Sequence, residues 1–418
     1  MTVHHIVPPY LLEHLERTAD DPNLRARYRQ SLQHDAVLRA RPAAAPSTQR
    51  EPAGEGARRV VHDAENGTSL PGVVVRSEGD DEVDDQAVNQ AYDGTGATWT
   101  MFKECFGRDS IDDAGLPLSS TVHFDRGYAN AFWDGAQMVF GDGDGEIFGN
   151  FTGSVDVTGH ELSHGVTQYT ADLVYEGQSG ALNESISDVF GSLAKQHHLG
   201  QSAAEADWLI GAGIFRPGVQ GVALRSMKAP GTAYDDPRLG RDPQPAHMSS
   251  YVETEDDHGG VHINSGIPNH AFYLVATALG GNAYGAAGKI WYATLTSGSL
   301  STTATFPDFA QVTHAAAVTL FGPTSSEAEA VATAWQSVGV SLEEVEGAPA
   351  EPGGESAESV ELMRAAKTAL STPTPPAPPA SAPPAPEPPA EPGPADEDAP
   401  TPDTPANPAA DPPSRDPG

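Results

Sequence analysis

The chain has 418 residues and a formal net charge of −35, and hydrophobic residues make up 38% of it. So large an acidic surplus argues against a nucleic-acid binder. No stretch approaches the ~20 apolar residues of a membrane helix, so no membrane segment is expected. The single cysteine, Cys105, excludes an intrachain disulfide. Its place in the amphipathic stretch 101–106 favours a buried structural thiol over a nucleophile.

The first 57 residues are predicted to form a separate leader and linker. Residues 1–59 carry a net charge of +2, whereas the remainder carries −37. Leu11, Leu12 and Leu15 recur at helical spacings, which predicts helix up to about residue 40. Residues 41–57 are mostly Pro, Ala, Gly and polar residues, which is typical of a flexible linker that proteases can cleave.

The extreme N-terminus, MTVHHIVPPYLL, has neither the basic head nor the apolar run of a secretory signal peptide. Secretion without a cleaved signal, or retention in the cytoplasm, is therefore expected.

The body of the chain begins with strands and continues with helices. Strand-like runs occupy 59–62 and 72–76, and helices are predicted over about 155–170 and 181–198. Further helical stretches follow at about 268–279, 284–296, 306–320 and 325–338. This order predicts an α+β protein with two lobes, over residues 58–168 and 169–341.

Residues 342–418 are predicted to form a disordered, acidic, Pro/Ala-rich tail. Residues 373–418 contain 19 prolines among 46 residues and cannot bury enough apolar area to offset chain entropy. A short isolated helix is possible over 358–370. A cell-wall spacer, a partner ligand and a trimmed extension remain open as roles for the tail.

The most informative motif is His160-Glu161-Leu162-Ser163-His164. Two histidines four residues apart on a helix share one face and can bind one metal ion. Glu161 lies between them and is better placed to face a water than to be a third ligand. This combination is what zinc-assisted amide hydrolysis requires. The alternative is a surface helix whose histidines align by chance.

A second predicted helix carries the residues that would complete such a site. Glu184 is suited to be the third zinc ligand. Asp188 lies one turn later on the same face and can accept the second ring N–H of a ligand histidine. Asn183 can do the same for the other histidine. A solvated acidic face is the alternative, but it does not explain why these polar residues alternate with large apolar ones.

The segment from His160 to Asp188 resembles the thermolysin family of zinc endopeptidases, in which nineteen residues separate the second histidine from the zinc glutamate, as here. The related zinc aminopeptidases usually have eighteen. The resemblance spans about residues 60–340 and includes the motifs at 129–133, 141–145 and 257–266. Pro8-Pro9-Tyr10-Leu11-Leu12 resembles the short prosequence of the protealysin-type subgroup, and the insertion-like stretch 233–248 fits the same subgroup.

This resemblance implies a two-lobed thermolysin-like (gluzincin) fold, with a β-rich N-terminal lobe, a mostly helical C-terminal lobe and the zinc site in the cleft between them. One catalytic zinc would be held by His160, His164 and Glu184, with a fourth position for water. Glu161 would act as general base.

Roles at the reacting carbonyl are also implied by the resemblance. His262 and Tyr175 would donate to the developing oxyanion, and Asp257 would orient His262.

The resemblance further implies a substrate cleft. Asn130 and the carbonyl of Ala131 would bind substrate backbone as an added strand, and Arg225 would hold a substrate carbonyl. Four apolar residues match the pocket for the residue after the scissile bond: Phe148, Val157, Ile210 and Leu224. A large hydrophobic residue is therefore the expected preference there.

The chain departs from thermolysin at the paired calcium site. Asp156 and Asp207 keep two acidic positions, but Lys195, Leu209 and Ala212 replace three others. Since calcium needs several oxygen ligands, no paired calcium site is expected.

Together these features predict a monomeric neutral zinc endopeptidase that acts on proteins or peptides. It would be made as a zymogen, with its own propeptide as intramolecular inhibitor. Two alternatives remain. A catalytically dead binding module is disfavoured because Glu161, His262 and the zinc ligands are intact. An aminopeptidase would need a cluster of acids for the free amine.

Overall fold

The computed structural model describes residues 4–39 and 56–342, which belong to one compact unit. Residues 40–55 of the predicted leader and linker, and nearly all of the predicted tail with its helix over 358–370, lie outside the described residues. Among the described helices, none has both the length and the hydropathy needed to cross a membrane.

The leader contributes one short strand and two helices: β1 (His4–His5), α1 (Pro9–Thr18) and α2 (Pro22–Arg39). Pro9 occupies the first helical position of α1, where its missing N–H costs nothing. As the helical spacing predicts, Leu11, Leu12 and Leu15 are all buried. Their burial packs α1 into the hydrophobic core of the body, so the leader is part of the folded unit.

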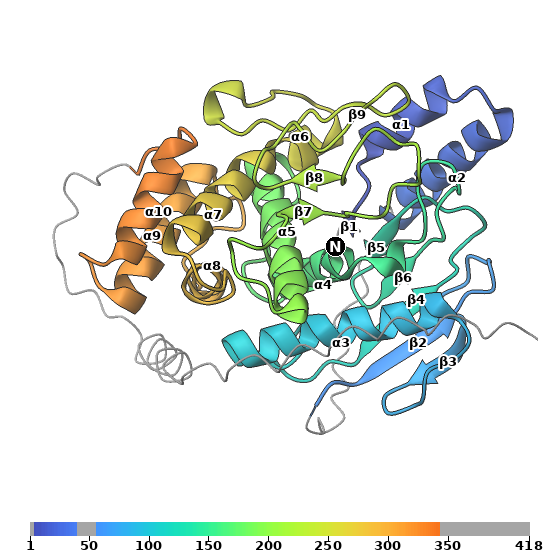
Figure 1. The fold of residues 1–418 in the computed structure, drawn as a ribbon, viewed down its shortest axis with the longest axis horizontal. Helices are drawn as coiled ribbons and strands as arrows, with labels where there is room; N and C mark the ends of the chain where they lie inside the picture. Colours follow the sequence, from blue (N-terminus) through green and yellow to red (C-terminus); the bar gives the residue numbers. More distant parts are fainter. Residues whose placement is uncertain (1–3, 40–55, 343–418) are drawn as a thin grey trace, which may run out of the picture. The chain divides into compact units, whose positions relative to one another are not determined.

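A six-stranded mixed sheet forms the first part of the body (Figure 1). Its order is β1-β5-β6-β4-β2-β3, with parallel pairing between β2 and β4 and between β4 and β6. The body strands are β2 (Arg59–Asp63), β3 (Val73–Ser77), β4 (Leu118–Val122), β5 (Ala131–Trp133) and β6 (Met138–Phe140). The leader strand β1 adds antiparallel to β5, so β5 is the body's own edge at this side.

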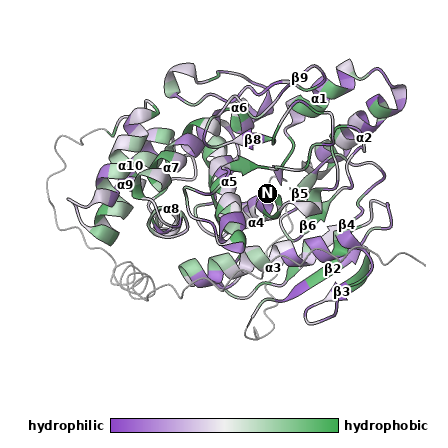
Figure 2. Cartoon of the chain, in the orientation of Figure 1, coloured by the Kyte–Doolittle hydropathy of each residue, from purple (hydrophilic) through white to green (hydrophobic). Residues whose placement is uncertain are grey.

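A long helix, α3 (Gln86–Phe106), follows the strands β2 and β3 in the chain. The Asp85 side chain caps it by accepting from the N–H groups of Ala87 and Val88, and Gly107 ends it in a left-handed conformation. Hydrophobic and hydrophilic residues alternate along α3 (Figure 2), and the stretch 101–106, with buried Cys105, is its last part.

Two adjoining helices carry the predicted metal motifs: α4 (Val155–Gln168), which follows the short 3-10 turn Phe151–Gly153, and α5 (Gly177–Leu199). They pack very closely at Gly191 of α5. A side-chain carbon there would lie 2.4 Å from the carbonyl oxygen of Asp156 and 2.9 Å from the backbone nitrogen of His160. Only glycine permits this approach, which sets the distance between the two helices.

The rest of the body is mainly helical, as the sequence order predicts. Two small two-stranded sheets come first, β7 (Leu209–Ile210) with β8 (Arg225–Ser226) and β9 (Asp235–Asp236) with β10 (Gly240–Arg241). After the 3-10 turn Met248–Ser250 come α6 (Asp257–Asn264), α7 (Gly266–Leu279), α8 (Ala286–Thr296), α9 (Phe306–Phe321) and α10 (Ser326–Ser337). Trp291 and Trp335 stack in the core of these helices.

A charged triad ties the start of α3 to the sheet. The two ring nitrogens of His123 lie 2.9 Å from Asp85 and 2.9 Å from Asp142, and the ring is mostly shielded from water. The hydrogen bond to Asp142, followed by that to Asp85, outweighs the opposing effect of burial and raises the pKa of His123 to about 9. The folded state therefore favours the protonated ring.

We predict a matching loss of stability at alkaline pH. Because the folded pKa of about 9 lies above the ordinary value near 6.5, this contribution is complete below pH 6.5 and is lost as the pH rises through 9. After solvent screening it amounts to about 1–2 kcal/mol. His123 has a φ of 53°, which asparagine tolerates, so His123→Asn is the matched control. Urea unfolding at pH 6 and pH 9.5 should show a larger loss for the wild type; equal losses would refute the assignment.

Candidate active site

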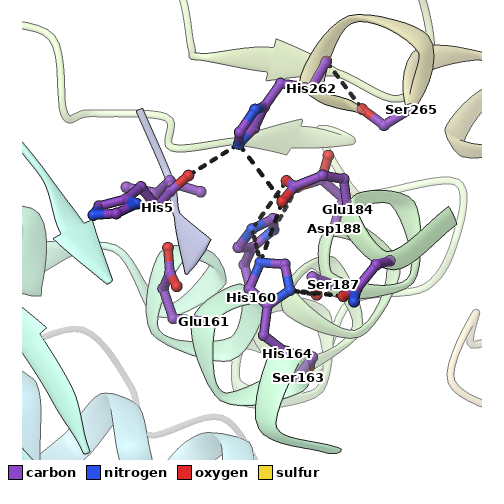
Figure 3. A network of polar contacts seen from close by, with 12 residues as sticks. His5, His160, Glu161, Ser163, His164, Glu184, Ser187, Asp188, His262 and Ser265 are labelled. Atoms are coloured by element: carbon purple, nitrogen blue, oxygen red, sulfur yellow. Dashed lines mark hydrogen bonds and ion pairs between the residues drawn. The ribbon is translucent and has the colours of Figure 1, made fainter. Parts of the chain in front are cut away.

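The two histidines of α4 and Glu184 of α5 converge at one buried point (Figure 3). Nε2 of His160 lies 3.0 Å from Nε2 of His164. Each of these nitrogens lies 3.5 Å from an oxygen of Glu184, and all three side chains are fully shielded from solvent. The structure thus brings the three predicted ligands together.

Neighbouring side chains fix which nitrogen of each histidine faces this point. Nδ1 of His160 lies 2.7 Å from the Asp188 carboxylate, and Nδ1 of His164 lies 2.8 Å from Oδ1 of Asn183. Because carboxylate and amide oxygens only accept hydrogen bonds, both Nδ1 atoms carry the proton. Both Nε2 lone pairs therefore face each other and the Glu184 carboxylate. These groups repel one another unless a cation is bound between them.

The donor set fits zinc. With Zn–N and Zn–O bonds of about 2.0–2.1 Å, tetrahedral ligand atoms lie roughly 3.3–3.4 Å apart. The separations of 3.0 and 3.5 Å bracket that value. Oε2 of Glu184 is also buried without a hydrogen-bond partner among the described residues, as expected of an oxygen reserved for a metal.

Asp188 links the histidine of α4 to an arginine on β8. It accepts hydrogen bonds of 2.8 Å from both Nε and Nη2 of Arg225 and one of 2.8 Å from Nδ2 of Asn269. Burial opposes ionisation of Asp188, but the charge of Arg225 and the contact with His160 outweigh it and hold its pKa below the usual range. The carboxylate is therefore negative when it orients His160.

Glu161 lies on α4 beside the cluster but points to β5. Its Oε2 accepts a 3.0 Å hydrogen bond from the backbone N–H of Trp133, while Oε1 is buried without a partner among the described residues. Burial, and then the charge of Glu184, raise the pKa of Glu161 well above its usual range. A carboxylate with one anchored and one unpaired oxygen is suited to take up a proton.

His262 approaches from the opposite side of the cluster, on α6. The helix opens with a left-handed turn from Asp257 to Gly260, with φ between 53° and 80°. This turn brings Oδ1 of Asp257 to 2.6 Å from Nδ1 of His262. Burial lowers the pKa of His262, but the charges of Glu184 and Asp257 outweigh it and raise the pKa to about 9.

Tyr175 lies in the same cluster. Its hydroxyl donates to Glu184 and lies 3.3 Å from Nε2 of His262. It is therefore next to the predicted oxyanion donor, although in this structure its hydrogen bond goes to the predicted metal ligand.

The leader crosses this site as an extended strand. Figure 3 shows the carbonyl of His5 turned toward His262, with Nε2 of His262 at 3.1 Å. The backbone N–H of Ile6 donates to the carbonyl of Ala131 at 3.1 Å, and Nη1 of Arg225 donates to the carbonyl of Ile6 at 3.0 Å.

The next leader residue continues the ladder. The N–H of Val7 donates to Oδ1 of Asn130 at 2.9 Å, and Nδ2 of Asn130 donates to the Val7 carbonyl at 3.2 Å. The predicted substrate-binding residues Asn130, Ala131 and Arg225 therefore all contact leader backbone.

The four residues of the predicted apolar pocket are buried, and so is the leader residue Ile6. Phe148, Val157 and Ile210 are fully buried and Leu224 almost so. Ile6 is also fully buried and belongs to the same hydrophobic cluster as these four residues.

Sequence reasoning missed the leader residues that meet the site. His4 stacks on the ring of His164 with centroids 4.1 Å apart. Asp35 of α2 is fully buried, where it lies 3.1 Å from Nε2 of His5 and accepts hydrogen bonds from Tyr128 and Asn130. The adjacent histidines before Pro8-Pro9 could have indicated that β1 approaches the site. Asp35 could not have been found in this way, because it is one charged residue among many polar ones in α2.

Where the sequence resemblance predicts the loss of the paired calcium site, the ammonium group of Lys195 lies between two acids. Its Nζ is 3.1 Å from Oδ2 of Asp156 and 2.8 Å from Oδ2 of Asp207. The backbone carbonyl of Leu209 lies 3.5 Å away. Burial lowers the pKa of Lys195, but the charges of the two aspartates outweigh it and raise the pKa overall.

Comparison with known proteins gives one consistent family. The thermolysin metallopeptidase catalytic domain matches residues 54–168, and the thermolysin metallopeptidase alpha-helical domain matches residues 171–340. An extracellular metalloprotease of Pectobacterium carotovorum subsp. carotovorum is 50% identical over 338 residues, which cover 81% of this chain and 96% of that protein. Protease PrtS of Photorhabdus sp. (strain Az29) is 47% identical over 346 residues, 81% of this chain and 92% of its own.

Among solved structures, the precursor of protealysin, a metalloproteinase from Serratia proteamaculans, matches with a TM-score of 0.75 and 50% sequence identity. The match covers 81% of this chain and 100% of that chain. It confirms the expected two-lobed thermolysin-like fold. The chain belongs to the thermolysin family and is a zinc metalloendopeptidase.

Proposed function

We propose that the processed protein is a neutral endopeptidase that cleaves internal bonds of proteins and peptides before large hydrophobic residues. The observation that carries this proposal is the run from His5 to Val7, whose backbone groups bond in turn to His262, Ala131, Arg225 and Asn130. The contacts of the leader backbone thus indicate how an extended substrate peptide would bind.

In this register the peptide bond between His5 and Ile6 takes the place of a scissile bond. Its carbonyl oxygen faces Nε2 of His262, and the following side chain, Ile6, is enclosed in the hydrophobic core. Substrates would then bind as an added strand on β5, and the enclosed position would select a large apolar residue.

The zinc ligands would be His160, His164 and Glu184. When bound there, zinc would lower the pKa of a water molecule and polarise the peptide carbonyl. Glu161 would take the proton of that water on its unpaired oxygen and later pass it to the leaving nitrogen. Asn183 and Asp188 would hold the histidine rings in the required tautomer.

His262 would donate to the carbonyl oxygen as negative charge develops on it, with Asp257 orienting the ring. Tyr175 would assist from its position beside His262, after its hydroxyl turns away from Glu184. Arg225 would hold the carbonyl of the residue after the cleaved bond.

The leader would make the newly synthesised protein a zymogen. With residues 4–7 in the cleft, no substrate strand can add to β5, so residues 1 to about 55 would act as an intramolecular inhibitor until the linker is cut. The precursor of protealysin, as a neighbour, supports this proposal. Relatives named extracellular proteases support secretion, and we propose that the enzyme acts as a monomer.

Replacing Glu161 by glutamine should reduce casein hydrolysis by about 10²–10⁴-fold, because the general base is lost while the metal ligands remain. Elemental analysis should still find one zinc per chain. Glu146→Gln, which changes an acid outside the site, serves as the matched control and should keep activity. Proteolysis by Glu161→Gln at the control's rate would contradict the assigned role.

The processed enzyme should prefer Leu, Phe or Ile after the cleaved bond. Burying such a side chain contributes about 1.5–3 kcal/mol, or roughly 10- to 150-fold in kcat/KM over an acidic or very small residue. Peptides blocked at both ends and varied at that one position would measure it. Cleavage only of peptides with a free amino terminus would support an aminopeptidase instead.

We also propose that no paired calcium site forms, because the ammonium group of Lys195 already forms ion pairs with both Asp156 and Asp207. Calorimetric titration of chelator-treated, zinc-reloaded protein should show no pair of tightly held calcium ions. Lys195→Ala should lower the melting temperature in calcium-free buffer, since it leaves Asp156 buried without its cation. Two tight calcium sites in the wild type would overturn the proposal.

A further inference from the structure

The insertion-like stretch 233–248 packs against the end of helix α6. Within it, the carboxylate of Asp242 is almost fully buried. This carboxylate accepts three backbone N–H groups at 3.0 Å each, from Gly231, Ala233 and Gln244. The three hydrogen bonds close the loop on itself, so Gln244 has a fixed place beside α6.

Gln244 reaches from this loop to the backbone of His262. Its Nε2 donates to the His262 carbonyl at 2.8 Å and to Oγ of Ser265 at 3.0 Å. The loop also lies tight against the first residue of α7. A side-chain carbon at Gly266 would lie 2.6 Å from the carbonyl oxygen of Pro245 and 3.0 Å from Cβ of Gln244. Because only glycine permits this approach, the loop and the junction of α6 with α7 are held together as one packed unit.

The backbone of His262 needs such support because α6 is not a regular helix. Residues 258–260 have left-handed φ and ψ, so only residues 261–264, about one helical turn, keep helical geometry. Asp257 holds one side of His262, by accepting from its backbone N–H at 2.9 Å as well as from its ring. Gln244 holds the other side, at the carbonyl. The position of the imidazole is therefore set from both ends of the residue.

Stability alone does not explain the amide of Gln244. Its Oε1 is buried without a hydrogen-bond partner among the described residues, which destabilises the folded state. A methionine would have the same length without this unpaired oxygen. The His262 carbonyl would still accept from Oγ of Ser265 at 3.1 Å (Figure 3). What the amide alone supplies is the second, shorter hydrogen bond that holds the His262 carbonyl in place.

We propose that Gln244 is a positioning residue for the reaction: through the carbonyl of His262 it holds the imidazole where the ring donates to the developing oxyanion. The inference rests on the role proposed for His262 and adds that the insertion-like stretch supports that role. Loss of the amide would misplace a donor that acts mainly in the transition state. The turnover number kcat should therefore fall while KM stays nearly constant.

Steady-state kinetics of Gln244→Met in the processed enzyme test this. We expect kcat for a blocked peptide to fall about 10- to 100-fold and KM to change less than about twofold, with zinc content and melting temperature close to those of the wild type. Gln244→Leu, a second apolar variant, should show the same fall. The matched control is Gln196→Met on α5, another buried glutamine whose Oε1 has no partner among the described residues. An unchanged kcat in Gln244→Met, or an equal fall in the control, would overturn the proposal.

A double-mutant cycle with His262→Ala separates positioning from general support of the fold. In each variant a trace of wild-type enzyme cuts the linker, and a Glu161→Gln sample treated alike gives the background rate. His262→Ala alone should lower kcat by about 10²–10³-fold, because the oxyanion loses a donor. If Gln244 acts through His262, adding Gln244→Met should then change kcat by less than about twofold. Additive losses would overturn the proposal, whereas wild-type activity of His262→Ala would refute the role of His262 itself.

Discussion

The close contact of α4 and α5 at Gly191 is what allows a metal site to exist in this chain. It brings two imidazoles of one helix and a carboxylate of the other to within 3.5 Å of one another, fully shielded from solvent. Lone pairs and negative charge repel one another in a dry interior. A cation bound between them would remove this repulsion and stabilise the cluster. The hydrogen bonds that the two rings donate to Asp188 and Asn183 keep the rings from turning away from the cluster.

The same buried network couples the metal cluster to the peptide strand. Arg225 bonds to Asp188, which orients His160, and also to the carbonyl of Ile6. Asn130 likewise bonds to the leader backbone and to the buried carboxylate of Asp35. Through Arg225, the same side chain contacts the leader backbone and the carboxylate that orients His160.

The metal cluster could be predicted from the sequence because the residues that form it follow a recognisable spacing on two helices. The spacing of His160, His164 and Glu184 on two helices requires no knowledge of the tertiary fold. Helix α3 was mostly missed, since Gly94 and neighbouring threonines are poor helix formers. The glycine is there because Thr158 of α4 packs against it, at 3.0 Å from where a side-chain carbon would lie.

The leader's contribution could not be predicted in detail. That β1 adds to β5, and that His4 and His5 face opposite sides, depends on a register set by contacts more than a hundred residues apart in sequence. Asp35 gave no signal because its partners, Tyr128 and Asn130, come from the body. The roles assigned to individual substrate-binding residues, and the division into lobes at residue 168, remain predictions.

The central claim is that one zinc ion is held where α4 meets α5 while the leader strand lies across it. A crystal structure of the full-length Glu161→Gln protein, with data collected on both sides of the zinc absorption edge, tests it most directly. The account predicts a single strong anomalous peak between His160, His164 and Glu184, with the His5 carbonyl beside His262. An absent peak at full zinc loading of the buffer, or a leader that lies elsewhere, would contradict it.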